Sequence, residues 1–264
     1  MEVRLKFDLI SDIHVDVWGG LIKIDDFLNS LTKKSDVLIV AGDVSNYVSS
    51  SVYFLEKAKQ HYKTVIFVEG NHEYYSSIPM DDIVSYLKKS SNEIGFYYMD
   101  GTNYVIVEDV AIVGINMWYD FHYATGCDAN ESKYTWYKSS SDSRRITFKN
   151  SPEIMAKSAI DIIENTIKDL NENPSIRSIV VVTHTSPITE AILVKEDDDI
   201  WNSINGAYGC KEAQRLFKYS KITNWVFGHV HSQHDIIKDG IRYVVNPRGN
   251  PGEIQNFDTK TIEV

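Results

Sequence analysis

Near its amino end the chain reads FDLISDIH (residues 7–14), an apolar run that stops at an aspartate and a histidine two positions apart. Short apolar runs with polar ends are typical of buried strands. Three later runs end in similar chemistry: they read VLIVAGD (residues 37–43), VIFVEGNHE (residues 65–73) and WVFGHVH (residues 225–231). Because open α/β sheets collect functional residues at the carboxyl ends of their strands, the repeated pattern predicts one shared polar site.

Amphipathic segments separate the early runs, with apolar side chains at helical spacing over residues 21–34, 52–61 and 81–89. Strands that alternate with helices predict a layered α/β domain. From Gly95 onward the apolar runs become closely spaced, which favours antiparallel pairing or a second sheet. These closely spaced runs are residues 96–99, 104–107 and 110–115.

The second half of the chain contains further helix and strand patterns. The expected elements are a long helix over residues 154–170, a buried strand over 179–183, and a hairpin over 233–237 and 241–245. Residues 119–150 form the least regular stretch and are rich in aromatic and polar side chains, which indicates either a lid over the site or a simple surface cover. No linker interrupts the sequence, so we expect one domain over residues 1–264 with a lid-like insert at 119–150.

The composition is that of a soluble globular protein, with 43% of the 264 residues hydrophobic and 24% charged. The 27 basic and 37 acidic residues give a net charge of −10, which disfavours a broad grip on nucleic acid but not a phosphorylated substrate held by cations. Cys127 and Cys210 match neither a zinc spacing nor a disulfide framework, so we expect both to be reduced. No segment reads as a signal peptide or a membrane span, which predicts a cytoplasmic protein without a membrane partner.

The polar residues at the ends of the runs have the chemistry of metal ligands. Asp12 and His14 lie two apart, so at the end of an extended strand both side chains can point to one face. Asp43 adds a carboxylate that could bridge two cations, and Asn71 adds a neutral amide oxygen. The set is completed by three imidazoles, those of His184, His229 and His231. Oxygen and nitrogen donors without a thiolate suit borderline divalent cations.

Each of these residues also has a simpler interpretation. Asp12 could form a turn or cap a helix, and the glycines of the motifs could be ordinary turn residues. The histidines could be hydrogen-bonded residues of the core or of loops, and Glu73 could merely cap the helix that follows it. The acidic run 196–199 lacks the ligand spacing of a calcium loop, so a solvated surface is the better interpretation. The metal interpretation is favoured because the donors recur at one strand end after another.

In this order the motifs resemble the five blocks of the calcineurin-like metallophosphoesterase superfamily. The blocks are DIH (12–14), GD (42–43), GNHE (70–73), TH (183–184) and GHVH (228–231). Within the superfamily the chain is most similar to the small bacterial and phage phosphohydrolases, through NMWYDF (116–121), residues 142–146 and NPRG (246–249). The resemblance implies a four-layer α/β/β/α sandwich with two mixed sheets and a metal site at the strand carboxyl ends.

The resemblance also implies a dinuclear site in which Asp43 lies between the metals. One metal would be held by Asp12, His14, Asp43 and His231, and the other by Asp43, Asn71, His184 and His229. The cofactors would be two divalent or mixed-valence ions, with manganese favoured over iron, zinc, nickel and cobalt. A hydroxide that bridges the ions would attack the phosphorus of a phosphodiester or phosphomonoester, and His72 would protonate the leaving oxygen.

One departure from the superfamily narrows the choice of substrate. Its phosphoprotein phosphatases continue from Gly-Asp to Asp-Arg-Gly, whereas residues 44–47 here read VSNY, so the usual orienting aspartate of His72 is missing. Arg248 is a candidate phosphate contact, and Asn71 could contact substrate as well as metal. We therefore expect a small, nucleotide-like phosphoester as substrate. The alternatives are a nuclease, a phosphoprotein phosphatase and a catalytically silent metal-binding scaffold, and the oligomeric state is open.

Overall fold

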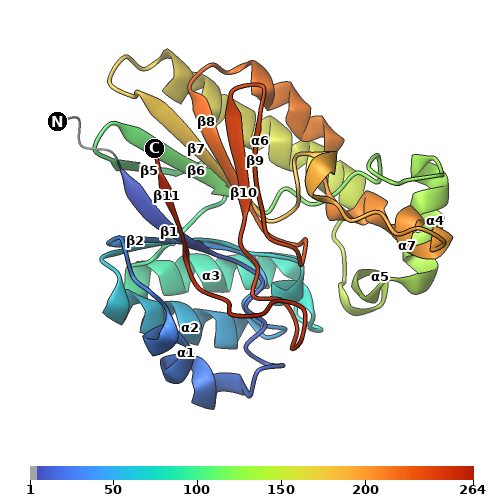
Figure 1. Ribbon diagram of the computed structural model, residues 1–264, viewed down its shortest axis with the longest axis horizontal. Coiled ribbons are helices and arrows are strands. Elements are labelled where there is room, and N and C mark those ends of the chain that lie inside the picture. The colour runs from blue at the N-terminus through green and yellow to red at the C-terminus, as the bar shows by residue number, and fades with distance from the viewer. Residues whose placement is uncertain (1–4) are drawn as a thin grey trace.

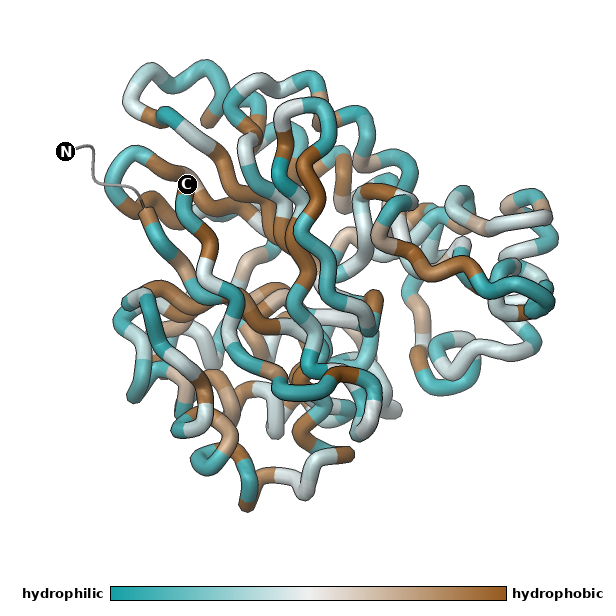
Figure 2. The backbone as a smooth tube through the Cα atoms, in the orientation of Figure 1, coloured by the Kyte–Doolittle hydropathy of each residue, from teal (hydrophilic) through white to brown (hydrophobic). Residues whose placement is uncertain are grey.

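Two mixed β-sheets pack face to face between outer layers of helices in the computed structural model, which describes residues 5–264 (Figure 1). One sheet has five strands and the other has six. The strands carry the most apolar stretches of the chain, as the brown segments in the middle of Figure 2 show. The α/β/β/α sandwich expected from the sequence is confirmed.

The first sheet combines the amino-terminal third of the chain with its last strand. Its strands are β1 (Lys6–Ile10), β2 (Val37–Ala41), β3 (Thr64–Val68), β4 (Tyr97–Tyr98) and β11 (Lys260–Glu263), in the order β11-β1-β2-β3-β4. Strands β1 to β4 run parallel, while β11 pairs antiparallel with β1 and places Ile262 opposite Phe7. The helices on its outer face are α1 (Ile24–Ser30), α2 (Val48–His61) and α3 (Met80–Ile94). The helix expected over 21–34 is therefore shorter, and a 3-10 turn at Gly20–Lys23 precedes it.

The second sheet has a parallel centre with an antiparallel hairpin at each edge. Its strands are β5 (Tyr104–Val107), β6 (Val110–Ile115), β7 (Ser178–Thr183), β8 (Ile222–Phe227), β9 (His234–Lys238) and β10 (Ile241–Val245). The order is β5-β6-β7-β8-β10-β9, with β5–β6 and β9–β10 as the hairpins. The long helix α6 (Pro152–Glu172) and the 3-10 helix η5 (Lys211–Lys218) pack against this sheet through buried residues such as Ile160 and Leu216. The second sheet and the hairpin predicted from the sequence are thus both present.

Alternation along each strand divides the core into two parts. In β2, Val37, Ile39 and Ala41 pack against the second sheet, while Leu38 and Val40 pack under the helices. Side chains of a strand alternate between its two faces, so a strand covered on both faces is apolar throughout. Burying one such aliphatic side chain contributes about 1.5–3 kcal/mol. This two-sided burial holds the strand ends in place.

Residues 119–150, predicted to be irregular, contain the helices α4 (Ala129–Ser139) and α5 (Ser141–Arg145). Together with α7 (Asp199–Ile204) and the 3-10 helix η4 (Asn205–Tyr208) they form a lobe beside the sandwich (Figure 1). The expectation of irregular structure was wrong because α4 buries only Ser132 and Trp136, which is too few for an apolar period. The available signal was the capping box formed by Asp128 and Glu131.

Backbone hydrogen bonds join the loops that follow the strands of the two sheets. Ser11 N–H, after β1 of the first sheet, donates to the carbonyl of Asn246, after β10 of the second sheet, over 3.0 Å. The carboxyl ends of both parallel cores therefore meet at one edge of the sandwich.

Among residues 5–264, no helix has the length and apolar character that crossing a bilayer requires.

Candidate metal centre

The predicted ligands sit in loops with an unusual backbone conformation. Asp12, His14, Asp43 and His229 have φ values of 50°, 47°, 54° and 67°, in the left-handed region. Non-glycine residues there cost on the order of 1–3 kcal/mol each and persist only where surrounding structure fixes them. Here the fixing contacts include the hydrogen bond of 3.1 Å from His14 N–H to the Asp43 carbonyl. Backbone strain is thus present at four of the seven positions that the sequence predicts to bind metal.

Two motif glycines are required by close approach of neighbouring chain segments. A Cβ on Gly70 would lie 2.1 Å from Asp43 Oδ1, and one on Gly228 would lie 2.4 Å from the Ala41 carbonyl oxygen. Both separations are far inside van der Waals contact. Any other residue would push apart the loops that carry the candidate ligands.

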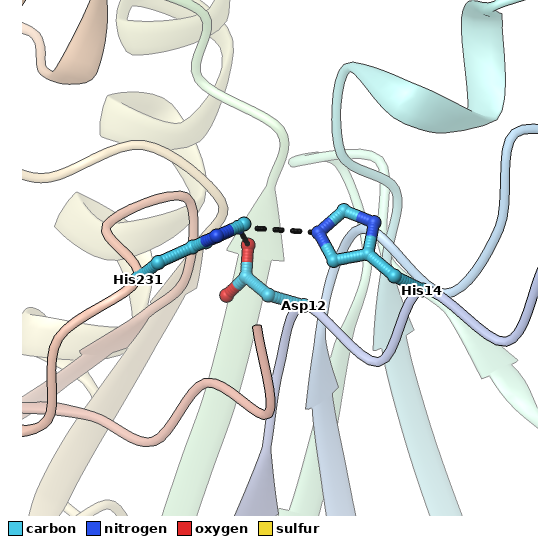
Figure 3. A group of neighbouring side chains, drawn as sticks. All are labelled: Asp12, His14 and His231. Atoms are coloured by element: carbon cyan, nitrogen blue, oxygen red, sulfur yellow. Dashed lines mark hydrogen bonds and ion pairs between the residues drawn. The ribbon is translucent and has the colours of Figure 1, made fainter. Parts of the chain in front are cut away.

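The first group of donors contains Asp12, His14 and His231 (Figure 3). His231 Nε2 lies 3.1 Å from His14 Nε2 and 3.7 Å from Asp12 Oδ1. Asp12 Oδ1 accepts the His229 N–H over 2.9 Å. Asp12 Oδ2 is buried and has no hydrogen-bond partner among the described residues. Such an oxygen is costly to leave alone, and a cation would satisfy it.

The second group contains Asp43, His184 and His229, with Asn71 beside them. His184 Nε2 lies 3.3 Å from Asp43 Oδ1, 2.9 Å from Asn71 Oδ1 and 3.2 Å from His229 Nδ1. A third group, made of His14, Asp43 and His72, connects the first two. The structure therefore brings all the ligands predicted from the sequence to one place.

The outer nitrogens of three histidines show which atoms face inward. His184 Nδ1 bonds to the Ala41 carbonyl (2.9 Å), and His229 Nε2 bonds to the Ala207 carbonyl (3.1 Å). His231 Nδ1 bonds to Glu253 Oε2 (2.6 Å). Because those oxygens accept, the outer nitrogens carry hydrogen and the inner nitrogens can present lone pairs. Nitrogen ligands at about 2.1 Å from one ion lie about 3 Å apart when they are adjacent. The observed separations of 3.1 and 3.2 Å fit this requirement, so the residues fit divalent metal ions.

The charge states of the metal-free site follow from burial and from Asp43. Burial lowers the pKa of His14 and of His229 to about 3, which keeps both rings in the neutral form that binds metal. Burial also opposes the charging of His184, but the neighbouring Asp43 carboxylate outweighs it and raises the pKa of His184 to about 10. The same pairing holds the pKa of Asp43 well below its usual range in spite of burial. A negative charge at the centre of the site is thereby retained.

Glu73 has a larger role than the helix cap considered from the sequence. Its buried carboxylate accepts the N–H groups of Gly70 (2.7 Å), Asp43 (3.1 Å) and Val44 (2.8 Å) and the hydroxyl of Ser51 (2.9 Å). Burial and Asp43 raise the pKa of Glu73 to about 7. It ties together the loops that follow β2 and β3, and its position in the GNHE motif was the only signal for this role.

The orienting partner of His72, which the sequence left unassigned, is Asn46. Asn46 Nδ2 donates to Asp16 Oδ2 over 2.5 Å, so its Oδ1 must be the atom that lies 2.7 Å from His72 Nδ1. An amide oxygen only accepts, and therefore His72 Nδ1 carries a hydrogen and Nε2 faces Asp43 Oδ2 at 3.7 Å. Asp16 and Asn46 were not identified from the sequence because single polar residues in a turn give no periodic signal.

Asp142, from the lobe, fixes the side chain of Asn71. Its Oδ1 accepts Asn71 Nδ2 over 2.8 Å and the Tyr75 hydroxyl, and its Oδ2 accepts the Tyr119 hydroxyl over 2.8 Å. Because a carboxylate accepts only the amide nitrogen, Asn71 Oδ1 is turned toward His184 and the centre of the site. The lobe therefore contributes directly to the orientation of a candidate ligand.

Arg248 does not lie where a phosphate contact would. Its guanidinium lies 4.2 Å from the centre of the Trp18 ring and 4.1 Å from that of Phe27. It is not among the residues that line the cavity at the metal centre. The aromatic pair holds this side chain outside the lining of that cavity. The two cysteines, Cys127 and Cys210, are both free, as expected.

A cavity of about 640 Å³ opens beside the metal centre. The strand-end side supplies Asp43, Asn71, His72 and His229 to its wall, and the lobe side supplies residues 139–142 and the segment 192–208. This volume lies in the range of small-molecule sites. The cavity is therefore large enough for an organic phosphoester next to the candidate metals.

The family model of the calcineurin-like phosphoesterases matches residues 5–233. The chain belongs to the calcineurin-like phosphoesterase family, and its donor groups suit the divalent metals on which that family depends.

Individual proteins are similar to this chain in sequence or in structure. The uncharacterized protein L509 of Acanthamoeba polyphaga mimivirus is 25% identical over 266 residues, which cover 94% of this chain and 92% of that one. The phosphopantetheinyl hydrolase of Mycobacterium tuberculosis has a similar structure, with a TM-score of 0.80, 18% identity and coverage of 99% and 97%. A putative 5′-nucleotidase of Staphylococcus aureus gives a TM-score of 0.51 with 14% identity, covering 94% of this chain and 49% of its own. At these identities the solved structures establish the fold.

Proposed function

We propose that this protein is a dinuclear metal-dependent phosphoesterase that hydrolyses a small organic phosphoester. The observation that carries the proposal is the convergence of imidazole nitrogens on two buried carboxylates. Three of the rings have their outer nitrogen engaged, and one carboxylate has an unpartnered oxygen. Divalent ions bound there would supply Lewis acidity toward the phosphoryl group and an acidified water.

The groups of neighbouring donors support the ligand sets that the family resemblance implies. One ion would be held by Asp12, His14, Asp43 and His231, and the other by Asp43, Asn71, His184 and His229. Manganese remains the favoured metal. Iron, zinc, nickel and cobalt are alternatives because they accept the same kinds of ligand. Asp43 would be shared, because its carboxylate lies in a group with His184 and His229 of one set and also in a group with His14 of the other.

His72 is the proposed proton donor. Hydrolysis breaks the bond between phosphorus and the leaving oxygen and forms a bond from phosphorus to a water oxygen, so the leaving oxygen must gain a proton while the water loses one. His72 Nε2 faces the site, and the bond from Nδ1 to Asn46 keeps the ring in that orientation. Positioned acids of this kind contribute roughly 10²–10⁴ in rate.

A small substrate is supported by the charge of the protein and by the dimensions of the cavity. The net charge of −10 opposes a long nucleic acid, and the cavity of about 640 Å³ suits a molecule the size of a nucleotide. The structural relatives include one named for a phosphopantetheinyl group and one named as a 5′-nucleotidase. Both names refer to organic groups that carry a phosphate.

The test compares turnover of bis-p-nitrophenyl phosphate and p-nitrophenyl phosphate by manganese-loaded protein. We expect hydrolysis of at least one ester, and a loss on the order of 10³-fold or more in Asp43→Asn, since this change removes the shared carboxylate. Asp235→Asn, which alters a surface carboxylate paired with Arg242, is the control and should keep full activity. Metal-loaded protein that hydrolyses neither ester would instead support the non-catalytic scaffold.

A further inference from the structure

A row of aromatic rings leads away from the metal centre along the lobe side of the cavity. The Tyr208 ring centre lies 5.0 Å from that of His229, and the Trp201 ring centre lies 5.8 Å from that of Tyr208. Lys195 Nζ ends the row, 3.5 Å from the centre of the Trp201 ring. All these residues except the metal ligand His229 belong to the lobe segment 192–208, and all line the cavity.

The charge along this wall opposes a second phosphate. Among the described residues that line the cavity, Lys195 is the single lysine or arginine, and Asp142 and Glu253 add negative charge. Sites for polyphosphates use several cations or bidentate arginines. The aliphatic side chains Ile192, Leu193 and Ile204 also line the cavity, and the other polar residues that line it outside the metal centre are uncharged serines and asparagines. Beyond the reacting phosphoryl group, the wall therefore suits an uncharged organic group.

One buried polar atom of the wall points to the kind of group. Asn205 is fully buried and lines the cavity, and its Nδ2 donates to the Leu193 carbonyl over 2.9 Å. Its Oδ1 has no hydrogen-bond partner among the described residues. A buried acceptor of this kind is costly to leave unpaired, so a ligand with an N–H donor would satisfy it. Flat rings that carry N–H groups combine this donor with a face that packs on Tyr208 and Trp201.

The proposed proton donor and the aromatic row contact different residues of the candidate metal centre. His72 packs beside His14, with ring centres 4.6 Å apart, whereas Tyr208 packs beside His229. The leaving group must contact His72, so a group bound along Tyr208 and Trp201 is the one that stays on phosphorus. A molecule with a leaving group and a retained group on one phosphorus is a phosphodiester.

We infer that the row formed by Tyr208 and Trp201 binds the retained group of a phosphodiester, and that this group carries a nitrogen-containing flat ring such as a nucleobase. The inference rests on the proposed phosphoesterase function and specifies its substrate class. Cleavage would release the leaving alcohol at His72 and leave a nucleoside-type monophosphate along the row.

The experiment uses two diesters with the same leaving group, so that only the retained group differs. They are the p-nitrophenyl ester of thymidine 5′-monophosphate and ethyl p-nitrophenyl phosphate. Trp201→Ala should raise KM for the thymidine ester about tenfold more than KM for the ethyl ester, because stacking on a base is lost. Trp201→Phe keeps a ring and should restore most of the difference. Tyr134→Ala removes an exposed aromatic of α4 that does not line the cavity, and should change neither KM.

Binding of thymidine 5′-monophosphate, measured by calorimetry, provides a readout that does not depend on turnover. The affinity should fall about tenfold in Trp201→Ala and stay unchanged in Tyr134→Ala. Equal KM changes for the two esters in Trp201→Ala, or equal nucleotide affinity in this variant and the parent, would overturn the inference and leave the phosphoesterase function intact. Absence of turnover with every ester would overturn the proposed function, and the calorimetry would then still decide whether the row binds the ring.

Discussion

The candidate metal centre is built from two regions that position their side chains in different ways. The loops after β1, β2, β3, β7 and β8 are held by backbone hydrogen bonds, by left-handed residues such as Asp12 and Asp43, and by glycines that permit close approach. The lobe of α4, α5 and α7 instead reaches the centre through single side chains, above all through Asp142. Its helices are short, and several of its apolar residues, such as Ile200, are exposed.

Under the proposed function, the metal chemistry is placed on the strand ends of the sandwich and the substrate selectivity on the lobe. A metal site needs positions fixed within fractions of an ångström, and strands buried on both faces provide them. A substrate wall tolerates small shifts, so a peripheral lobe is sufficient for it. Asp142 is the exception that connects the two supports. The predictions below test whether the two regions are as different as the structure indicates.

The largest effect is expected on the strand-end side, at the proton donor. His72→Ala should reduce the rate on esters with poor leaving groups by about 10²–10⁴ and should affect p-nitrophenyl esters much less, because a good leaving group needs no proton. Asn46→Ala should give a smaller loss of the same kind, since it frees the ring without removing it. Steady-state kinetics on alkyl and nitrophenyl esters of one series provide the measurement. Equal losses on both kinds of ester would argue against proton donation by His72.

An intermediate effect is expected where the lobe meets the metal centre. Asp142→Ala should weaken metal binding about 10–100-fold, as loss of a residue that orients a ligand does, because Asn71 can then rotate its amide nitrogen toward the ion. Metal content after dialysis against a chelator measures this without an activity assay. Tyr119→Phe, which removes one hydrogen bond to Asp142 but keeps the ring, should have a smaller effect. Unchanged metal affinity in Asp142→Ala would show that the lobe only covers the centre.

The smallest effect is expected within the lobe itself. Asp128 caps α4 by accepting the N–H groups of Asn130 (2.8 Å) and Glu131 (3.0 Å), and Asp128→Ala should destabilise that helix by about 1 kcal/mol. Hydrogen exchange should then become faster in α4 while β2 and β7 keep their protection, if the lobe opens separately from the sandwich. Faster exchange throughout the molecule would instead make the lobe and the sandwich one cooperative unit.

Much of the fold could be predicted because its signals are local. Runs such as VLIVA in β2 predict strands that are buried on both faces, and the apolar residues at helical spacing along α6 predict a helix. The helix α4 was not predicted because it buries only Ser132 and Trp136, too few side chains for an apolar period, and its cap gave the only indication. The strand β11 was also not anticipated, since KTIE gains its partner from β1 at the other end of the chain.

The sequence by itself determined the donors, their order and their attachment to strand ends, because ligand pairs such as Asp12 and His14 lie within one local motif. Only the tertiary structure decided which residues orient them. Asp142 lies 71 positions from Asn71 and Glu253 lies 22 from His231, so no local spacing relates each pair. It also decided that Arg248 packs between two aromatic rings, and that Trp201 stands on the wall of the cavity. A spacing can show which atoms are able to bind, but hydrogen-bond partners across the fold depend on distances that only packing sets.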